Sequence, residues 1–562
     1  MNDLPGTLDQ LTARLETLEQ RVYVLEHPSA VFQESETNPA PIHATVEDRS
    51  FAQAGGLFSV AGRAMLGIAG AYVLRAVAES TSLPKLAVAA IAIAYAVLWL
   101  VWAVRVKAAN WVPSAIYAGT SAVILAPMLW ELTLSFKVLA PSATAAILTA
   151  FVLAASALAW KRNLTPVFWV ANATAAAAAL ALAIATHQLI PFIGALLLLV
   201  LTCEFAAKLN RESTVRPLVA VAADLAIWAL IFIYAGPQNA RVDYPTLGTT
   251  ALLAPGGVLF LIYAASIAVR TILHGQKIAV FETFQSVIAF LLAASSVLYF
   301  EPRFGATGLG VACLFLAAAC YSLVLAMFRE FSAGRNYQIF AAWGTSLLLA
   351  GSILCLPSFG GTLCLGLAAI SFTLLGIRLN RLTLQVHGLV LLVAATILSG
   401  LPGYVFQALA GTLPITLTAG VCVASGCALV CCAAGKHAVE ETSVRHSLHL
   451  VPAALAVCAV AALLVQGMLF LVALRIAPDV YHVAFIRTLT CCAVALAVAF
   501  AGSHLHRLEL TRIAYAAVAF VAAKLVFEDL RHGHFEFIAA SIFLFAITLI
   551  AVPRLARASQ RP

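Results

Sequence analysis

The strongest constraint on this chain is a succession of apolar runs, each long enough to cross a lipid bilayer. A membrane-spanning helix needs about 20 apolar residues at roughly 1.5 Å per residue. Before Leu57 the chain is polar, and after it polar residues are mostly confined to short loops. We count 18 runs, at 57–78, 84–104, 113–132, 138–160, 164–186, 189–206, 215–235, 249–269, 278–299, 306–327, 338–356, 359–377, 383–400, 412–434, 447–473, 482–502, 512–527 and 535–553.

The composition leaves few alternatives to a membrane protein. Of the 562 residues, 62% are hydrophobic and 10% are charged, whereas a soluble domain is about one quarter charged. So few polar residues cannot cover a soluble core of this size. The runs do not resemble the roughly ten-residue alternating strands of an outer-membrane barrel. The sequence therefore predicts an all-α polytopic membrane helix bundle, with about 18 transmembrane helices over residues 57–553.

Basic residues indicate how these helices cross the membrane. Most Lys and Arg beyond the N-terminal segment lie in loops that follow even-numbered runs, such as Lys161 and Arg162, or in the tail at 554–562. Cytoplasmic loops are the ones enriched in Lys and Arg. Met1 opens a stretch that lacks the apolar region of a signal peptide. We therefore expect a multi-pass protein of a bacterial inner membrane, with both termini in the cytoplasm.

Residues 1–26 carry a heptad pattern. Arg14 and Arg21 fall at g positions and Glu19 and Glu26 at e positions, so each Arg faces a Glu of a parallel partner. The pattern predicts a short coiled coil that joins copies of the chain into a homo-oligomer. An amphipathic helix docked on the protein itself or on a lipid surface is the alternative. The core positions are Leu8, Leu11, Leu15, Leu18, Val22 and Leu25.

The segment between the coiled coil and the first run has no period. Residues 27–56 are rich in Pro, Ser, Glu and Thr. Such a composition is typical of a flexible polar linker.

Two charged residues lie well inside predicted membrane helices. Arg63 stands six residues into the first run, and Asp224 stands eight residues after Arg216 in the seventh. A charge at the bilayer centre costs about 2.5–3.5 kcal/mol on insertion scales, so each needs a partner. Their similar depths predict a buried Arg63–Asp224 ion pair. Arg75, near the other end of the first run, can reach water by extending its side chain.

A second charged cluster surrounds the end of the seventeenth run. Lys524 and Glu528 are i, i+4 neighbours, Asp529 follows directly, and Arg487 enters the sixteenth run from the same side. Two interpretations stay open. The cluster is either a ligand or proton site at the outer surface, or a salt-bridged lid over two hairpins.

The eighth run contains Pro255, Gly256 and Gly257. Pro removes an intrahelical hydrogen bond and Gly relaxes the backbone. Broken helices often line transporter sites, so this segment is a candidate helix break, with a simple kink as the alternative. Glu204 and Glu282 lie near the ends of their runs, where we expect contact with lipid headgroups or water.

The sequence predicts no cofactor, metal or nucleic-acid site. All 12 Cys fall inside apolar runs, where they serve as small core hydrophobes. No phosphate-binding loop, nucleophile elbow or zinc-protease motif is present, so no catalytic residue is predicted. Topology and lipid headgroups explain the basic residues better than nucleic acid does.

Three stretches resemble one family of bacterial membrane proteins. They are the segment LTARLETLEQRVYVLE with its linker, the first run GRAMLGIAGAYVLRAVAE, and RIAYAAVAFVAAKLVFEDL near the C-terminus. In these stretches the chain is similar to domain-of-unknown-function family 2339, with Lys524, Asp529 and Leu530 at corresponding places. His532 and His534 depart from that family's Arg and aromatic pattern. The resemblance implies many inner-membrane helices and supplies no activity, substrate or catalytic residue.

Two function classes follow from these observations. The number of runs, the Pro255 segment and the charges of Arg63 and Asp224 favour a transporter or flippase for a small or lipid-like substrate. The scarcity of polar residues within the runs favours a non-transporting membrane scaffold organised by its coiled coil. Nine runs in each half would give the halves opposite orientations, as inverted repeats require, although no similarity between the halves is visible in the sequence.

Overall fold

The computed structural model describes residues 60, 62–73, 76, 84–106, 111–209, 214–237, 241–327, 334–411, 413–434, 443–476, 478–532 and 534–558. The predicted coiled coil at 1–26, the linker at 27–56 and Arg75 lie outside the described residues.

From residue 84 onward, the described residues form 19 α-helices and two short π-helical segments. The first half contains α3 (Lys85–Arg105), α4 (Trp111–Leu134), α5 (Pro141–Arg162), α6 (Thr165–Thr186), α7 (Leu189–Lys208), α8 (Val215–Ala235), α9 (Thr249–Ala268), the π-helix η2 (Val269–Leu273) and α10 (Val280–Phe300). The second half contains α11 (Gly305–Met327), α12 (Arg335–Cys355), α13 (Ser358–Arg378), α14 (Leu382–Ser399), α15 (Leu401–Ala410), α16 (Ala419–Ala434), α17 (Ser443–Ala473), α18 (Val480–His504), α19 (Leu508–Lys524), the π-helix η4 (Leu525–Asp529), α20 (Leu530–His532) and α21 (Phe535–Ala558).

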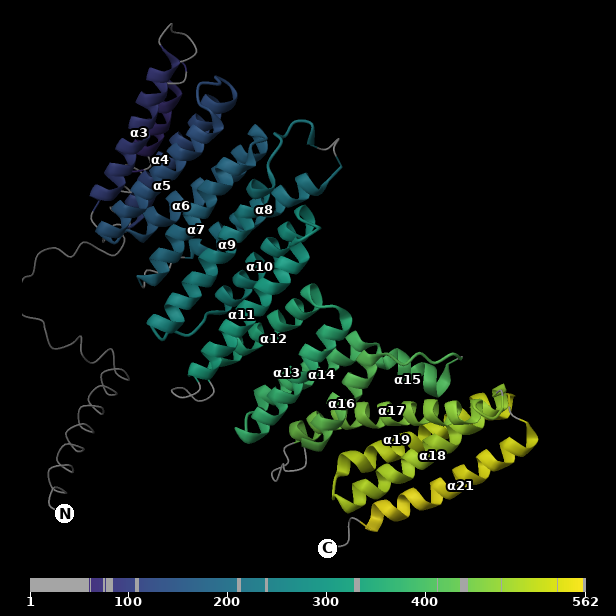
Figure 1. Ribbon diagram of the computed structural model, residues 1–562. Coiled ribbons are helices and arrows are strands. Elements are labelled where there is room, and N and C mark those ends of the chain that lie inside the picture. Colours follow the sequence, from purple (N-terminus) through teal and green to yellow (C-terminus); the bar gives the residue numbers. More distant parts are fainter. Residues whose placement is uncertain are drawn as a thin grey trace, which may run out of the picture.

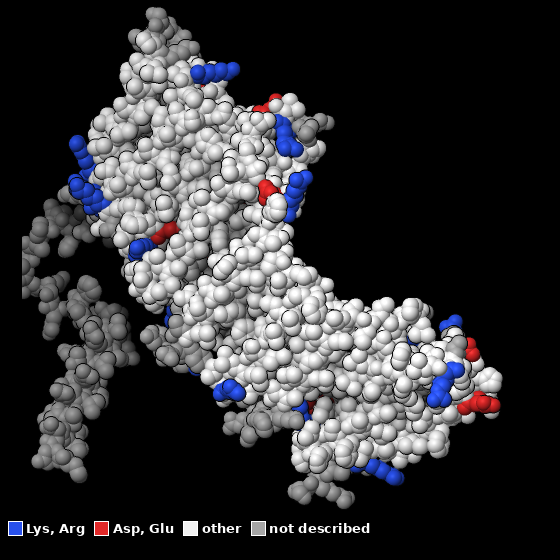
Figure 2. All heavy atoms as spheres, in the orientation of Figure 1, with Lys and Arg blue, Asp and Glu red and all other residues white. Residues whose placement is uncertain are grey.

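Fifteen of the described helices are long and apolar enough to cross a membrane. Two shorter apolar helices, Ala89–Arg105 and Ala419–Ala434, lie at other predicted runs, and residues 62–73 of the first run are helical. In Figure 2, Lys, Arg, Asp and Glu lie toward the edges of the molecule, and the broad sides between them are uncharged. The prediction of an all-α, multi-pass membrane protein in contact with the lipid bilayer is therefore confirmed.

The helices follow one another in space largely in chain order. Figure 1 shows a curved row that runs from α3 at the upper left to α21 at the lower right. Most helices pack against their neighbours in sequence, and α4 with α6, α13 with α16 and α18 with α21 also pack together. The arrangement is an extended row of helical hairpins and not a round bundle.

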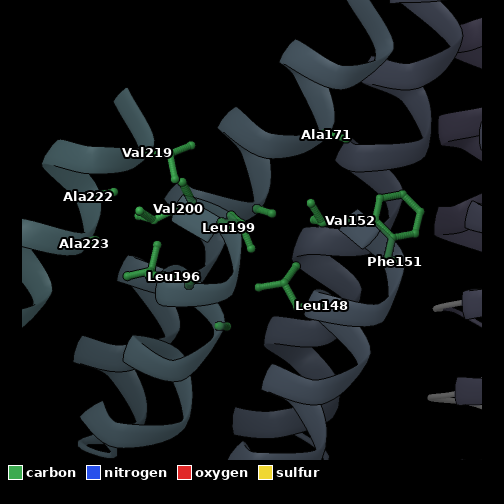
Figure 3. Close-up of a cluster of buried hydrophobic side chains, with 14 of the residues drawn as sticks. Leu148, Phe151, Val152, Ala171, Leu196, Leu199, Val200, Val219, Ala222 and Ala223 are labelled. Carbon is green, nitrogen blue, oxygen red and sulfur yellow. The ribbon is translucent and has the colours of Figure 1, made fainter. Parts of the chain in front are cut away.

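The largest apolar core lies among the helices of the first half. Figure 3 shows Leu148 of α5 and Leu196 and Leu199 of α7 within this core, with Ala171 of α6 and Ala223 of α8 in the same cluster. Lipid tails are as apolar as Leu, so helices in a membrane associate through close packing, which small residues permit. The alanines therefore allow neighbouring helices to approach each other.

Three helical hairpins share one connection. The hairpins α5–α6, α13–α14 and α18–α19 each turn through a residue in the left-handed conformation, at Asn163, Asn380 and His506. The next amide in each turn donates to the carbonyl five residues earlier, which satisfies a carbonyl at the helix C-terminus. These bonds run from Leu164 N to Ala159 O (2.9 Å), from Arg381 N to Gly376 O (2.8 Å) and from Arg507 N to Gly502 O (3.0 Å).

Two of these connections also share a sequence signature, GIRLNRL at 376–382 and GSHLHRL at 502–508. The leading glycine allows the second helix of each hairpin to come close. A Cβ at Gly376 would lie 2.9 Å from Gln385 N, and a Cβ at Gly502 would lie 3.0 Å from Thr511 N. The structure thus reveals a local repeat that the sequence analysis missed.

Helix α15 was not predicted. It is ten residues long and lies between the predicted runs at 383–400 and 412–434. Gly400, with φ +79°, ends α14 and starts α15, and Pro402 occupies the first turn, where its missing N–H costs nothing. The helix is too short to cross a bilayer.

Candidate functional site

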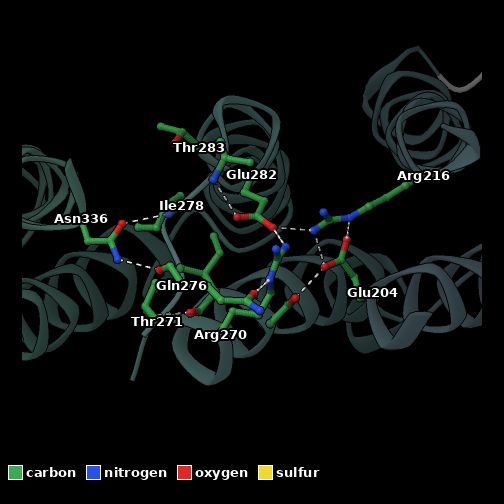
Figure 4. Close-up of polar contacts among 12 residues, drawn as sticks. Glu204, Arg216, Arg270, Thr271, Gln276, Ile278, Glu282, Thr283 and Asn336 are labelled. Carbon is green, nitrogen blue, oxygen red and sulfur yellow. Dashed lines mark hydrogen bonds and ion pairs between the residues drawn. The ribbon is translucent and has the colours of Figure 1, made fainter. Parts of the chain in front are cut away.

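Four charged side chains form a buried network among α7, α8, η2 and α10. We call Glu204, Arg216, Arg270 and Glu282 the Glu204 network. Arg216 donates from Nε and Nη2 to the two oxygens of Glu204, both at 2.7 Å, and from Nη2 to Glu282 Oε1 at 3.0 Å. Arg270 pairs with the same oxygen of Glu282. Figure 4 shows the two carboxylates bridged by Arg216.

Neutral groups complete the Glu204 network. Ser266 donates to Glu204 Oε2 at 2.6 Å, and Arg270 Nε donates to Gln276 Oε1 at 2.9 Å. The N–H of Ala279 donates to Glu282 Oε2 at 3.0 Å. Glu204 and Glu282 are only 4% and 2% exposed. The expectation that these two carboxylates contact headgroups or water is therefore wrong, because Arg216 of α8 and Arg270 of η2 reach them from neighbouring helices.

The charges predicted around the end of the seventeenth run do come together. We call Arg487, Lys524, Glu528 and Asp529 the Arg487 network. Arg487 Nη1 donates to Glu528 Oε1 at 2.8 Å, and Lys524 Nζ lies 2.7 Å from Asp529 Oδ1 and 3.3 Å from Glu528 Oε2. Lys524 also donates to Ala484 O at 2.9 Å. Arg487, Lys524 and Asp529 are buried, and Glu528 is 22% exposed in its side chain.

Arg487 also holds the C-terminal end of α15. Its Nε donates to Ala408 O at 2.8 Å, and its Nη2 donates to Gln407 O at 3.0 Å and to Gly411 O at 2.6 Å. The last carbonyls of a helix lack intrahelical donors, and the helix dipole favours a cation there. Arg487 therefore joins the ion network to a short helix that does not span the membrane.

Each network includes a π-helical turn. Arg270 lies in η2 at the end of α9, and Glu528 and Asp529 lie in η4 at the end of α19. A π turn inserts a residue into the helical ladder and is frequent at functional sites. In this protein both π turns bring charged side chains toward a neighbouring helix.

The structure does not bring Arg63 and Asp224 together. Asp224 accepts two hydrogen bonds from Gln285 Nε2 of α10, at 2.8 and 2.9 Å. Arg63 instead lines a cavity beside α3 and α4. Similar depth in the membrane was the basis of the predicted pair, but α8 lies several helices away along the row in Figure 1. The order in which the helices lie side by side determined the partner of Asp224, and this order could not be read from the sequence pattern.

The candidate break at Pro255, Gly256 and Gly257 is also corrected, because α9 is continuous through all three residues. Gly256 packs on α10, where an added Cβ would lie 3.0 Å from Ala293 Cα. The small residue therefore serves close helix packing.

An apolar cavity of about 440 Å³ lies beside the Arg487 network, among α15, α17, α18 and α19. All its lining residues are aliphatic, aromatic, Pro or Cys. Leu409 and Ala410 bring the end of α15 into the wall, and Cys491 lies one turn after Arg487 on α18. Other lining residues include Phe406, Ala461, Ala516 and Phe520.

Among the described residues, no group of three or more His, Cys, Asp or Glu side chains is placed to hold a metal ion. No protein-family model, curated protein or solved structure matches this chain.

Proposed function

We propose that this protein binds lipid molecules within the membrane and acts as a transporter or flippase for a lipid-like substrate. The cavity among α15, α17, α18 and α19 carries the proposal. Among the described residues, its wall offers a polar solute only the weak thiol donors of Cys458 and Cys491, whereas a lipid acyl chain needs only apolar contact. Three of the four helices are long and apolar enough to cross a bilayer. The surrounding bilayer would therefore supply lipid as the apolar ligand of this cavity.

The Arg487 network supports a conformational role at this cavity. Leu409 and Ala410 in the cavity wall sit beside the carbonyls that Arg487 holds. Movement of α15 away from α18 would break three charge-assisted hydrogen bonds, each stronger than a neutral one. The network therefore holds the wall in place, and release of α15 would open the cavity to a larger ligand.

A lipid-transfer assay tests the transport proposal. Full-length protein is reconstituted into vesicles with a fluorescent phospholipid, and a membrane-impermeant quencher reports how fast the label reaches the outer leaflet. Ala516→Phe places a ring in the cavity and should slow transfer several-fold. Ala519→Phe, also exposed on α19 but outside the lining, is the matched control. Equal transfer rates with and without protein would contradict transport.

A non-transporting membrane scaffold is the second candidate. Its support is that the buried charges of both networks are paired with opposite charges, so neither network leaves a carboxylate unpaired to carry protons or ions. The coiled coil at 1–26 would organise this scaffold as a homo-oligomer. Deletion of residues 1–26 should then lower the oligomeric state in detergent, measured by light scattering. An unchanged molar mass would remove the coiled coil from the proposal.

We also propose that the chain crosses a bacterial inner membrane 18 times, with both termini in the cytoplasm. We further propose that it is related to domain-of-unknown-function family 2339. The support for these proposals is the distribution of Lys and Arg among the loops, together with the three resembling stretches. Topology reporters fused after Arg162 and after Gly236 test the orientation. The first should report cytoplasm and the second periplasm. The reverse pattern would overturn the proposed orientation.

A further inference from the structure

A second cavity, of about 570 Å³, lies between the first predicted helix, α3 and α4. Its lining combines two arginines with four aromatic side chains. These residues are Arg63, Arg105, Tyr95, Trp99, Trp102 and Tyr117. The cavity differs from the apolar one beside α15, because it presents charge and hydrogen-bond donors.

Small residues on the first helix create this site. Gly67 packs on the ring of Trp99 and Gly70 on Tyr95, where side chains larger than hydrogen would clash. Tyr95 donates its hydroxyl to Gly67 O at 3.2 Å. Since these contacts run in opposite order along the two helices, the helices are antiparallel. Arg63, near the start of one, therefore lies at the same end as Arg105, the last residue of α3.

The charge at this end favours an anion. Arg63 and Arg105 are exposed, and none of the described residues that line the cavity is an Asp or Glu. In Figure 2 the lower-left ends of α3 to α5 carry basic side chains without acidic ones beside them. Guanidinium groups bind phosphate through paired, charge-assisted hydrogen bonds.

Trp99 supplies an independent observation. It is 4% exposed, and its Nε1 has no hydrogen-bond partner among the described residues. The indole N–H can only donate, and a buried donor without an acceptor is unfavourable. Its ring lies against Trp102 at 5.1 Å and Tyr117 at 5.7 Å between centroids. The cavity wall therefore contains a buried donor that has no partner among the described residues, and two cations line the same cavity.

We propose that this cavity binds the phosphate of an anionic phospholipid, with the headgroup against Arg63 and Arg105. A lipid source is favoured over a soluble phosphate because exposed apolar side chains, Leu66 and Trp102, flank the arginines. Trp and Tyr are also enriched where membrane meets water. This inference does not depend on lipid transport, since a headgroup site would serve a transporter or a scaffold.

Lipid binding to the full-length protein tests the site. Nanodiscs of phosphatidylcholine are prepared with increasing phosphatidylglycerol, and lipids that remain bound on release are counted by native mass spectrometry. The double variant Arg63→Gln with Arg105→Gln should weaken phosphatidylglycerol binding about tenfold or more, as expected when a pair of charged contacts is lost. Trp99→Phe keeps an aromatic ring, although a smaller one, removes the donor and should weaken binding less.

Arg162→Gln is the matched control, because Arg162 is exposed at the end of α5 but does not line the cavity. Unchanged phosphatidylglycerol binding in the double variant, or equal binding of phosphatidylcholine and phosphatidylglycerol by the native protein, would overturn the proposal. Inorganic phosphate at millimolar concentration should leave the bound lipid in place. Displacement by phosphate would assign the site to a soluble anion instead. Both arginines are exposed, and thermal unfolding of each variant verifies that it is folded.

Discussion

The two ion networks are built from the same kinds of groups but join different parts of the molecule. Each contains two cations, two carboxylates and a π turn. In the Glu204 network, each of four helical segments supplies one charge, and Arg216 bridges two carboxylates. In the Arg487 network, one arginine makes three bonds to the carbonyls of α15. The comparison teaches that buried charges can either tie spanning helices together or position a short helix beside a cavity.

The physical difference lies in what replaces each bond when it breaks. Every charge of the Glu204 network is buried, so a member that loses its partner cannot be hydrated instead. Glu528 of the Arg487 network is partly exposed. The first network is therefore suited to a permanent lock, and the second to an arrangement that can open.

The largest effect is expected at the carboxylate shared by two arginines. Glu282→Gln leaves Arg216 and Arg270 short of one negative charge in a buried site, and should lower the free energy of unfolding by about 3–5 kcal/mol. Thermal unfolding in detergent measures the change. Glu536→Gln, on an exposed position of α21, is the control and should leave the melting temperature unaltered. A similar melting temperature for both variants would contradict the proposal that the Glu204 network permanently holds its helices together.

A smaller and more local effect is expected at Arg487. Arg487→Met removes one ion pair and three bonds to α15, and should cost about 2–3 kcal/mol. Hydrogen exchange should accelerate at residues 401–411, while exchange in α7 and α8 stays as in the native protein. If protection were lost in both regions equally, the two networks would not be independent and the comparison would fail.

The smallest effect separates close packing from helix breaking in α9. Gly256→Ala should cost about 1 kcal/mol, because its Cβ meets the backbone of α10. Gly257→Ala meets no atom within 4 Å and should stabilise α9 by roughly 0.5–1 kcal/mol, since Ala is the better helix former. Urea or detergent titration of both variants measures the difference. If Gly256→Ala instead stabilised the protein as much as Gly257→Ala, the close packing of Gly256 on α10 would be contradicted and the idea of a flexible break restored.

The Arg487 network was predictable because three of its four members are close in sequence. Lys524, Glu528 and Asp529 lie within six residues, so any helical geometry keeps them near one another. The Glu204 network was missed because its carboxylates lie on different helices from the arginines that bind them. Arg216 stands at the start of one predicted run and Arg270 directly after another, and their pairing with Glu204 and Glu282 is visible only when α7 to α10 are assembled.

The Arg63–Asp224 pair is the reverse case, a contact that was predicted but does not form. Similar depth predicts Arg63 as the partner of Asp224, but Asp224 accepts its hydrogen bonds from Gln285. Gln285 is neutral, so opposite charge does not point to it. Helix α15 was missed for a related reason. Its ten residues are too few for a span, and its C-terminal carbonyls are satisfied by Arg487 from a distant part of the chain.

The sequence by itself determined that this chain is an all-α membrane protein. The bilayer demands long apolar segments with internally satisfied backbone groups, and that demand is visible residue by residue. Only the tertiary structure decided which helices are neighbours, where α15 lies and which charges are paired. The reason is that a helix face buries its apolar surface equally well against lipid or against another helix, so helix order depends on close fit and polar contacts between distant segments.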